Sequence, residues 1–182
     1  MRRTIWFALM TALLLTGCGR AGEEESFARF RESLEGKEIR FTAEITSQGE
    51  ADTVTFTGDV VRAGEETVLT VRSPETIRGV SVTMKGADRT LIYEDLVLAL
   101  TPLRPDSLAP CAAGHLLLEA VLRGHVLWTE GGEDHHTAAL FLSEDETVTL
   151  RRDAAGTPVY AEIARGERTE LILRLSNWQI KE

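Results

Sequence analysis

The strongest constraint on the fold is an alternation of apolar and polar side chains that recurs along most of the chain. It is clearest where Ile39, Phe41 and Ala43 alternate with charged residues and threonines. Successive side chains of a β-strand point to opposite faces, so this alternation predicts strands with one buried face. Similar runs, separated by turn residues about every ten positions, predict about six strands in residues 39–100 and about five in residues 125–175.

Two segments follow a helical period instead. Phe27, Phe30 and Leu34 recur at helical spacing, which predicts an amphipathic helix of about three turns that ends at Gly36. Residues 111–123 are rich in alanine and leucine and predict a second helix that ends before a glycine. The expected order is therefore a helix, six strands, a second helix and about five more strands.

This order predicts a mainly β protein of the α+β class. An antiparallel sheet of about eleven twisted strands curls toward a barrel, and helices can cover its concave face where the barrel stays incomplete. An apolar concavity of this kind binds apolar ligands. A tightly packed sandwich or barrel without a cavity fits the periodicity equally well. The residues predicted to line or cap a hydrophobic cavity are Phe41, Phe56, Leu69, Val71, Val82, Met84, Leu117 and Val121.

The N-terminus has the pattern of a cleavable export signal. Arg2 and Arg3 precede an apolar run over residues 5–15, which is too short to span a bilayer core of about 20 residues. Leu15-Thr16-Gly17-Cys18 follows and resembles the lipobox of bacterial lipoproteins, in which signal peptidase cuts just before an acylated cysteine. An ordinary secretory peptide with an incidental cysteine is the alternative.

The lipobox resemblance implies a domain plan and a location. Residues 1–17 are expected to be the signal peptide, residues 18–26 a lipidated tether, and residues 27–182 a single domain. Cys18 would carry the lipid, palmitate included, and hold the protein on the extracytoplasmic face of the cell membrane. The formal charge of −9 makes nucleic acid a poor partner and disfavours flat binding to anionic headgroups.

Residues that could support catalysis are few. The motifs of serine hydrolases, zinc proteases, P-loop enzymes and dinucleotide-binding enzymes are all missing. Cys111 is the only other cysteine, so no intramolecular disulfide is expected once Cys18 is lipidated. His135 and His136 are adjacent and would point to opposite sides of an extended segment, which favours a solvated loop over a metal site. We therefore expect no enzyme activity, no metal and no cofactor.

The architecture resembles the outer-membrane lipoprotein carrier (LolA/LolB-like) superfamily. The resemblance covers about residues 25–180 and rests on five patterns: the paired aromatics Phe27 and Phe30, the strand 39–43, the proline-led turn within 71–80, the helix 116–122 and the closing strand 176–180. It implies an incomplete barrel of eleven strands with helical lids, whose cavity holds acyl chains. The arginine that locks the lid in this family has no assignable counterpart among the many arginines of this chain.

Two functions follow as expectations. The first is a membrane-anchored lipoprotein that binds a lipid or acyl chain and receives or senses it at the cell envelope, since a tethered domain cannot shuttle freely as the soluble carrier does. The second is an interaction scaffold for an envelope protein or for a sporulation or germination enzyme, because the chain also resembles lipoproteins of spore-forming bacteria, one of which partners a peptidoglycan amidase. A hydrolase, the third option, would need a convergent polar cluster at a pocket mouth.

Overall fold

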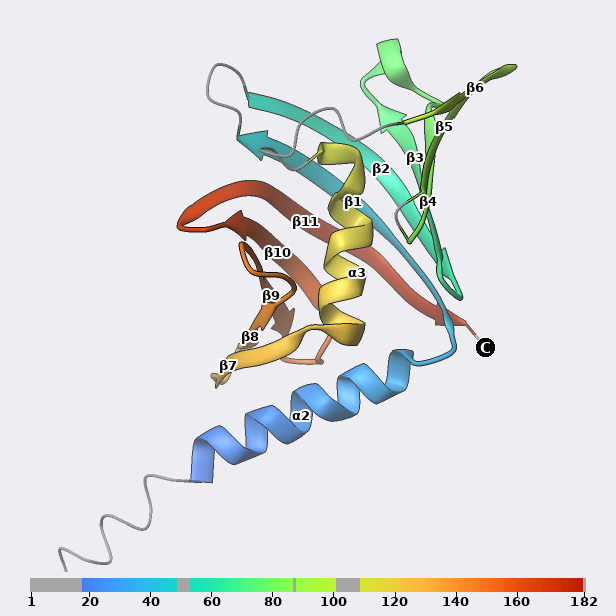
Figure 1. Cartoon of the computed structure of the whole chain (residues 1–182). Helices are drawn as coiled ribbons and strands as arrows, with labels where there is room; N and C mark the ends of the chain where they lie inside the picture. The colour runs from blue at the N-terminus through green and yellow to red at the C-terminus, as the bar shows by residue number, and fades with distance from the viewer. Residues whose placement is uncertain (1–17, 49–52, 87, 101–108, 182) are drawn as a thin grey trace, which may run out of the picture.

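The described part of the chain forms one open antiparallel sheet. The computed structural model describes residues 18–48, 53–86, 88–100 and 109–181. Within them, eleven strands are hydrogen-bonded in the order β6-β5-β4-β3-β2-β1-β11-β10-β9-β8-β7 (Figure 1). The edge strands β6 and β7 are separated by the whole width of the sheet, so the described strands curve without closing. The predicted incomplete barrel of eleven strands is confirmed.

The strand bounds agree with the sequence periodicity. The strands are β1 (Glu38–Gln48), β2 (Thr53–Ala63), β3 (Glu66–Ser73), β4 (Ser81–Lys85), β5 (Asp88–Tyr93), β6 (Leu96–Ala99), β7 (His125–Gly131), β8 (His135–Phe141), β9 (Glu146–Asp153), β10 (Pro158–Arg165) and β11 (Arg168–Lys181). Short turns keep consecutive strands adjacent, as at Gly64 and Gly166, whose φ angles of 60° and 58° suit glycine. The terminal strand β11 pairs with β1, which places both at the centre of the sheet.

Helix α2 (Cys18–Leu34) starts earlier than the sequence predicts. Residues 18–26 were expected to form a tether, but they are helical, and two of them contact the sheet. The Glu23 carboxylate lies 2.9 Å from the imidazole of His136, and Arg152 donates a hydrogen bond to Ser26. These contacts attach α2 to β8 and β9 at Glu23 and Ser26. Residues 1–17 lie outside the described part of the chain.

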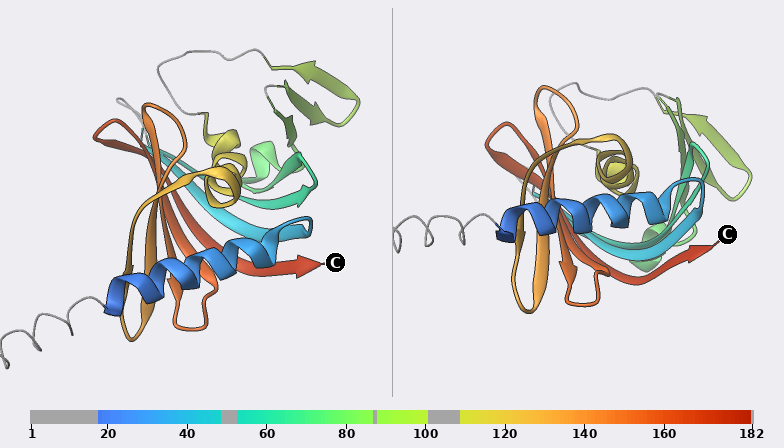
Figure 2. Two further views of the ribbon diagram at one scale, coloured as in Figure 1. Left: turned by 60° about the horizontal axis from the view of Figure 1, so that its bottom comes forward. Right: turned by 90° about the horizontal axis from the view of Figure 1, so that it is seen from below.

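The aromatic side of α2 packs on the sheet as its spacing predicts. Phe27 is buried and lies beside Phe30, and Phe30 approaches Trp178 of β11. Trp178 in turn stacks on Phe41 of β1, with ring centroids 4.8 Å apart. This row of aromatic rings fixes α2 across one open end of the curved sheet (Figure 2).

Helix α3 (Ala113–Arg123) lies inside the concave face (Figure 2). It packs against β3, β8, β9 and β10 and follows the short 3-10 helix η2 (Pro110–Ala112). Its start approaches β2 closely, because a Cβ atom at Gly114 would lie 2.8 Å from a methyl carbon of Val60. Only glycine permits that approach without displacement of the helix or the strand. The remaining short helix, η1 (Glu75–Ile77), connects β3 to β4.

Candidate ligand-binding face

All eight residues predicted to line or cap a cavity are buried in the structure. Six of them, from β1, β2, β3 and α3, belong to one core cluster: Phe41, Phe56, Leu69, Val71, Leu117 and Val121. Val82 and Met84 of β4 form a second, smaller cluster with Ala112. The structure therefore brings these positions together on the concave face, beneath or within α3. Their role as the wall of a ligand cavity stays a prediction.

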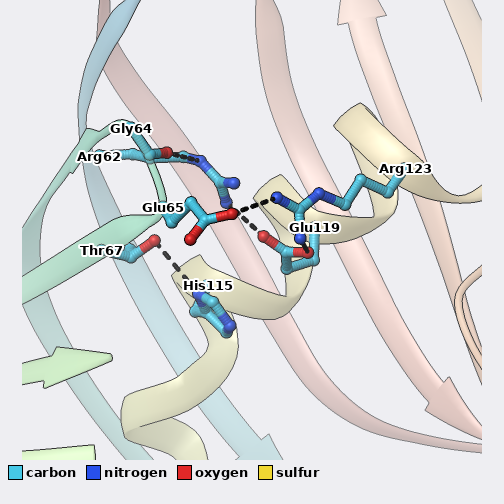
Figure 3. Close-up of polar contacts among 7 residues, drawn as sticks. All are labelled: Arg62, Gly64, Glu65, Thr67, His115, Glu119 and Arg123. Atoms are coloured by element: carbon cyan, nitrogen blue, oxygen red, sulfur yellow. Dashed lines mark hydrogen bonds and ion pairs between the residues drawn. The ribbon is translucent and has the colours of Figure 1, made fainter. Parts of the chain in front are cut away.

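A nearly buried ion pair attaches α3 to the sheet. Arg62 at the end of β2 has a side chain only 4% exposed, and one of its Nη atoms lies 2.7 Å from Oε1 of Glu119 on α3 (Figure 3). Its Nε donates to the carbonyl of Gly64 at 3.1 Å. Arg123 donates to the second oxygen of Glu119 at 3.1 Å but is 58% exposed. The Arg62–Glu119 pair is thus the inner contact and Arg123 the outer one.

A neutral contact lies one helical turn before Glu119. The Nδ1 atom of His115 is 3.2 Å from the hydroxyl of Thr67 on β3 (Figure 3). Burial lowers the pKa of His115, an effect that Glu119 opposes. The imidazole is therefore neutral at about pH 7, and this contact adds no charge to the interface between α3 and the sheet.

The other end of α3 is held by α2. The guanidinium of Arg31 donates to the carbonyl of Val121 and to the carbonyl of Gly124, both at 2.7 Å. A cation at this position satisfies backbone acceptors that a helix end leaves free and interacts favourably with the helix dipole. Together, Arg31, Arg62 and Gly114 hold α3 against the concave face along its length.

The apolar concave face continues beyond α3 onto the β5–β6 hairpin. Val82 pairs across with Leu91, and Leu91 with Leu98, so all three point to the concave side. Tyr93 and Leu96 form the next pair on that side. We call these four hairpin residues, Leu91, Tyr93, Leu96 and Leu98, the hairpin shelf. Leu96 and Leu98 are 52% and 44% exposed, and Figures 1 and 2 show the hairpin extending away from α3.

The opposite face and the outer edge of the same hairpin are also apolar. Ile92 is exposed, and Val97 is 63% exposed. Strand β6 contains only leucine, valine and alanine and forms one edge of the sheet. The other edge strand, β7, has a bulge between Val126 and Trp128 and packs against α2. Bulges and covering helices are common protections of an edge, so β6 is the less protected of the two.

The described residues offer little for catalysis or metal binding. No group of three or more His, Cys, Asp or Glu among them could hold a metal ion. The thiol of Cys111 is half-buried, and burial raises its pKa, which disfavours the thiolate needed of a nucleophile. His136 pairs with Glu23, whereas no contact joins it to His135 in the described structure. No helix in the described ranges is long and apolar enough to span a membrane.

The described residues thus form an open half-barrel with a helix on its concave face and an exposed apolar flank. No protein-family profile matches the chain, and no curated protein sequence does. Solved structures do match, 58 chains in all. A LolA superfamily protein from Nitrosomonas europaea is 13% identical with a TM-score of 0.47, and the match covers 87% of this chain and 93% of that one.

Two further solved structures also match the chain. A DUF1329 family protein from Desulfovibrio piger is 9% identical with a TM-score of 0.49, covering 88% of this chain and 92% of that one. A chain of the complex of the CwlD amidase with the GerS lipoprotein from Clostridioides difficile is 15% identical with a TM-score of 0.41, covering 80% and 90%. These solved structures, a LolA superfamily protein among them, are similar to the chain in fold at identities of 15% or less.

The sequence reasoning missed two features of this face. Arg62 follows the inward positions Phe56, Gly58 and Val60 of β2, and a charged residue in an inward register signals a buried pair. The hairpin was predicted as two strands but not as a site. The signal was present in residues 96–99, where apolar side chains occupy consecutive positions and so make both faces of the strand apolar.

Proposed function

We propose that this protein is a lipid-anchored, extracytoplasmic, non-enzymatic lipoprotein that binds a hydrophobic ligand on the concave face of its half-barrel. The observation that supports this proposal best is the hairpin shelf, where the apolar face that α3 covers elsewhere is exposed. Covering apolar surface contributes about 25 cal/mol per Å². A lipid or acyl chain on the shelf would extend the apolar layer that α3 forms over the rest of the sheet.

The position of the shelf relative to the anchor favours receiving or sensing a ligand. Cys18, the proposed lipid attachment residue, is the first residue of α2. In all three views the start of α2 and the β5–β6 hairpin lie at opposite ends of the domain (Figures 1 and 2). A membrane that holds Cys18 would therefore not cover the shelf, which stays accessible to a ligand arriving from elsewhere in the envelope.

Paired substitutions on the two faces of β6 test the ligand site. Leu96→Asp with Leu98→Asp should weaken binding of a fluorescent fatty-acid analogue by the full-length chain at least about tenfold, because each leucine loses roughly 1.5 kcal/mol or more of burial. Val97→Asp introduces a charge in the same strand on the opposite face and should change the affinity less than about twofold. Equal effects of the two changes, or no saturable binding by the unaltered chain, would refute the proposal.

Cysteine substitutions test the anchor. Cys18→Ser should abolish metabolic labelling with an alkyne fatty acid and release the protein from the membrane fraction, because the thiol is the only acceptor that the lipobox resemblance supplies. Cys111→Ser is the matched control and should retain both the label and the membrane fraction, since Cys111 lies half-buried beside the second core cluster. Persistent labelling of the Cys18 variant would exclude this anchor.

A second candidate function, an interaction scaffold for an envelope protein, is favoured by the other face of the hairpin. Ile92, Val97 and the open edge of β6 could accept an extended segment of a partner as an added strand. A photo-reactive residue placed at Val97 or Leu98 in cells separates the two functions. Lipid adducts at Leu98 support the first function, whereas protein adducts at both positions favour the second.

A further inference from the structure

We propose that the ligand of the hairpin shelf is a fatty acid whose carboxylate pairs with Arg89. This inference rests on the proposed function and names the ligand class for the same site. It starts from the placement of one arginine on the concave side of β5. Arg89 pairs across with Met84, which is buried, so the two side chains share a face. Leu91 follows two residues later on that face.

Arg89 is a half-buried cation without a counter-charge in the described structure. None of the ion pairs or side-chain hydrogen bonds among the described residues involves its guanidinium. Its backbone carbonyl accepts a hydrogen bond from the backbone N–H of Leu100, which holds the strand in place but does not neutralise the guanidinium. Removing an unpaired charge from water is costly, so a half-buried arginine next to leucine and methionine favours an anion beside it.

The neighbouring groups that the structure describes do not supply that anion. Glu119, the nearest acid of α3, is already shared by Arg62 and Arg123. Helix α3 has no acidic residue in its first turn and no side-chain cap at its start. Arg89 acts electrostatically on two titratable groups of this region, and it lowers the pKa of the Cys111 thiol and that of the His115 imidazole. Burial raises the pKa of the first and lowers the pKa of the second, so both are neutral at about pH 7.

The charged residues on either side of the β4–β5 turn face elsewhere. Asp88 precedes Arg89 directly and therefore points to the opposite face of the strand. Lys85 pairs across with Asp88 and shares that face. Of the charged residues that the structure describes around the β4–β5 turn, Arg89 is thus the one on the concave side, in a chain whose formal charge is −9.

The geometry matches an anionic group with one apolar tail. From Arg89 the shelf runs along β5 to Tyr93, four residues or about 13 Å at 3.3 Å per residue. A carboxylate can form two parallel hydrogen bonds to a guanidinium, and one carboxylate balances the single charge of Arg89. The tail would then lie over the half-buried Leu91 and over Leu98 and Leu96, which are exposed.

Calorimetry with probes that share a ten-carbon tail tests the head group. The full-length chain, kept in solution by an amphipathic polymer so that no detergent competes, is titrated with decanoate, decanol, decyltrimethylammonium and decyl phosphate. Decanoate should bind at least about tenfold more tightly than decanol, the gain expected of a charge-assisted pair, and decyltrimethylammonium should bind most weakly. Arg89→Gln should bring decanoate to about the affinity of decanol, and Arg89→Lys should retain part of the preference.

The control is an arginine on the other face of the sheet. Arg174→Gln removes an exposed guanidinium of β11 that faces Glu44 at 3.7 Å, and it should preserve the preference for decanoate. Equal binding of decanoate and decanol, or a preference that survives Arg89→Gln, overturns the carboxylate pairing but leaves the apolar site intact. Tighter binding of decyl phosphate than of decanoate overturns the choice of carboxylate. Failure of all four probes refutes the proposed function itself.

Discussion

Replacing Glu119 with alanine is expected to lower the free energy of unfolding by about 3 kcal/mol. The change leaves the guanidinium of Arg62 buried without its carboxylate partner, because the contact that remains is the carbonyl of Gly64. An unpaired buried charge destabilises the native state far more than the pair stabilises it. Urea unfolding followed by circular dichroism measures the loss as a lower midpoint at an unchanged slope.

Two further variants separate burial of the charge from loss of an ion pair. Arg123→Ala removes the exposed partner of Glu119 and should cost less than about 1 kcal/mol, as surface pairs do. The double change Arg62→Met and Glu119→Leu leaves no buried charge and should recover much of the stability that Glu119→Ala loses. If Glu119→Ala were as mild as Arg123→Ala, the Arg62–Glu119 pair would not be an important attachment of α3.

Leu117→Ala is expected to cost about 3 kcal/mol or more of folding stability. Leu117 is fully buried and belongs to the core cluster that α3 forms with β1, β2 and β3. Truncation removes apolar contacts on the concave face and leaves a cavity where the helix meets the sheet. The same urea titration measures the effect, and Leu127→Ala on β7, an exposed leucine, is the control with an expected cost below about 0.5 kcal/mol.

The Leu117 result also decides how firmly α3 is held. A cost below about 1 kcal/mol would mean that α3 contributes little to the core and could leave the concave face readily. The expected larger cost means that α3 is part of the folded core, so that the proposed ligand would lie beside it on the hairpin shelf. In that case the eight predicted cavity residues serve the stability of the domain, and ligand binding depends on Leu96 and Leu98.

Much of the fold follows from local patterns. In β1 the alternation of Ile39, Phe41, Ala43 and Ile45 with polar residues matches the burial of the strand. Turn residues such as Gly64 and Gly166 mark the hairpins. The start of α2 could not be predicted from the sequence in the same way, because the acidic residues 23–25 lack the apolar spacing of a packed helix. Glu23 and Ser26 contact β8 and β9, which are more than a hundred residues away along the chain and so leave no trace in a local pattern.

The candidate site was only partly predictable, for a related reason. The inward positions were identified correctly because a strand has a fixed period. Which of them α3 covers and which it leaves open depends on where a helix of fixed length lies across the sheet. Leu69 and Leu98 both face the concave side, but the first is buried under α3 and the second is exposed. The alternation that sets the inward register does not by itself distinguish the covered leucine from the exposed one.

The sequence by itself determined the class of fold, the inward register of β1 to β4, the absence of known catalytic motifs and the resemblance of residues 15–18 to a lipobox. Only the tertiary structure decided that Arg62 meets Glu119, that Arg31 holds the end of α3, and that Arg89 has no counter-charge among the described residues. The physical reason is that alternation sets the face on which a side chain lies, whereas its charge partners come from distant segments. Those segments meet only when the sheet curves around α3.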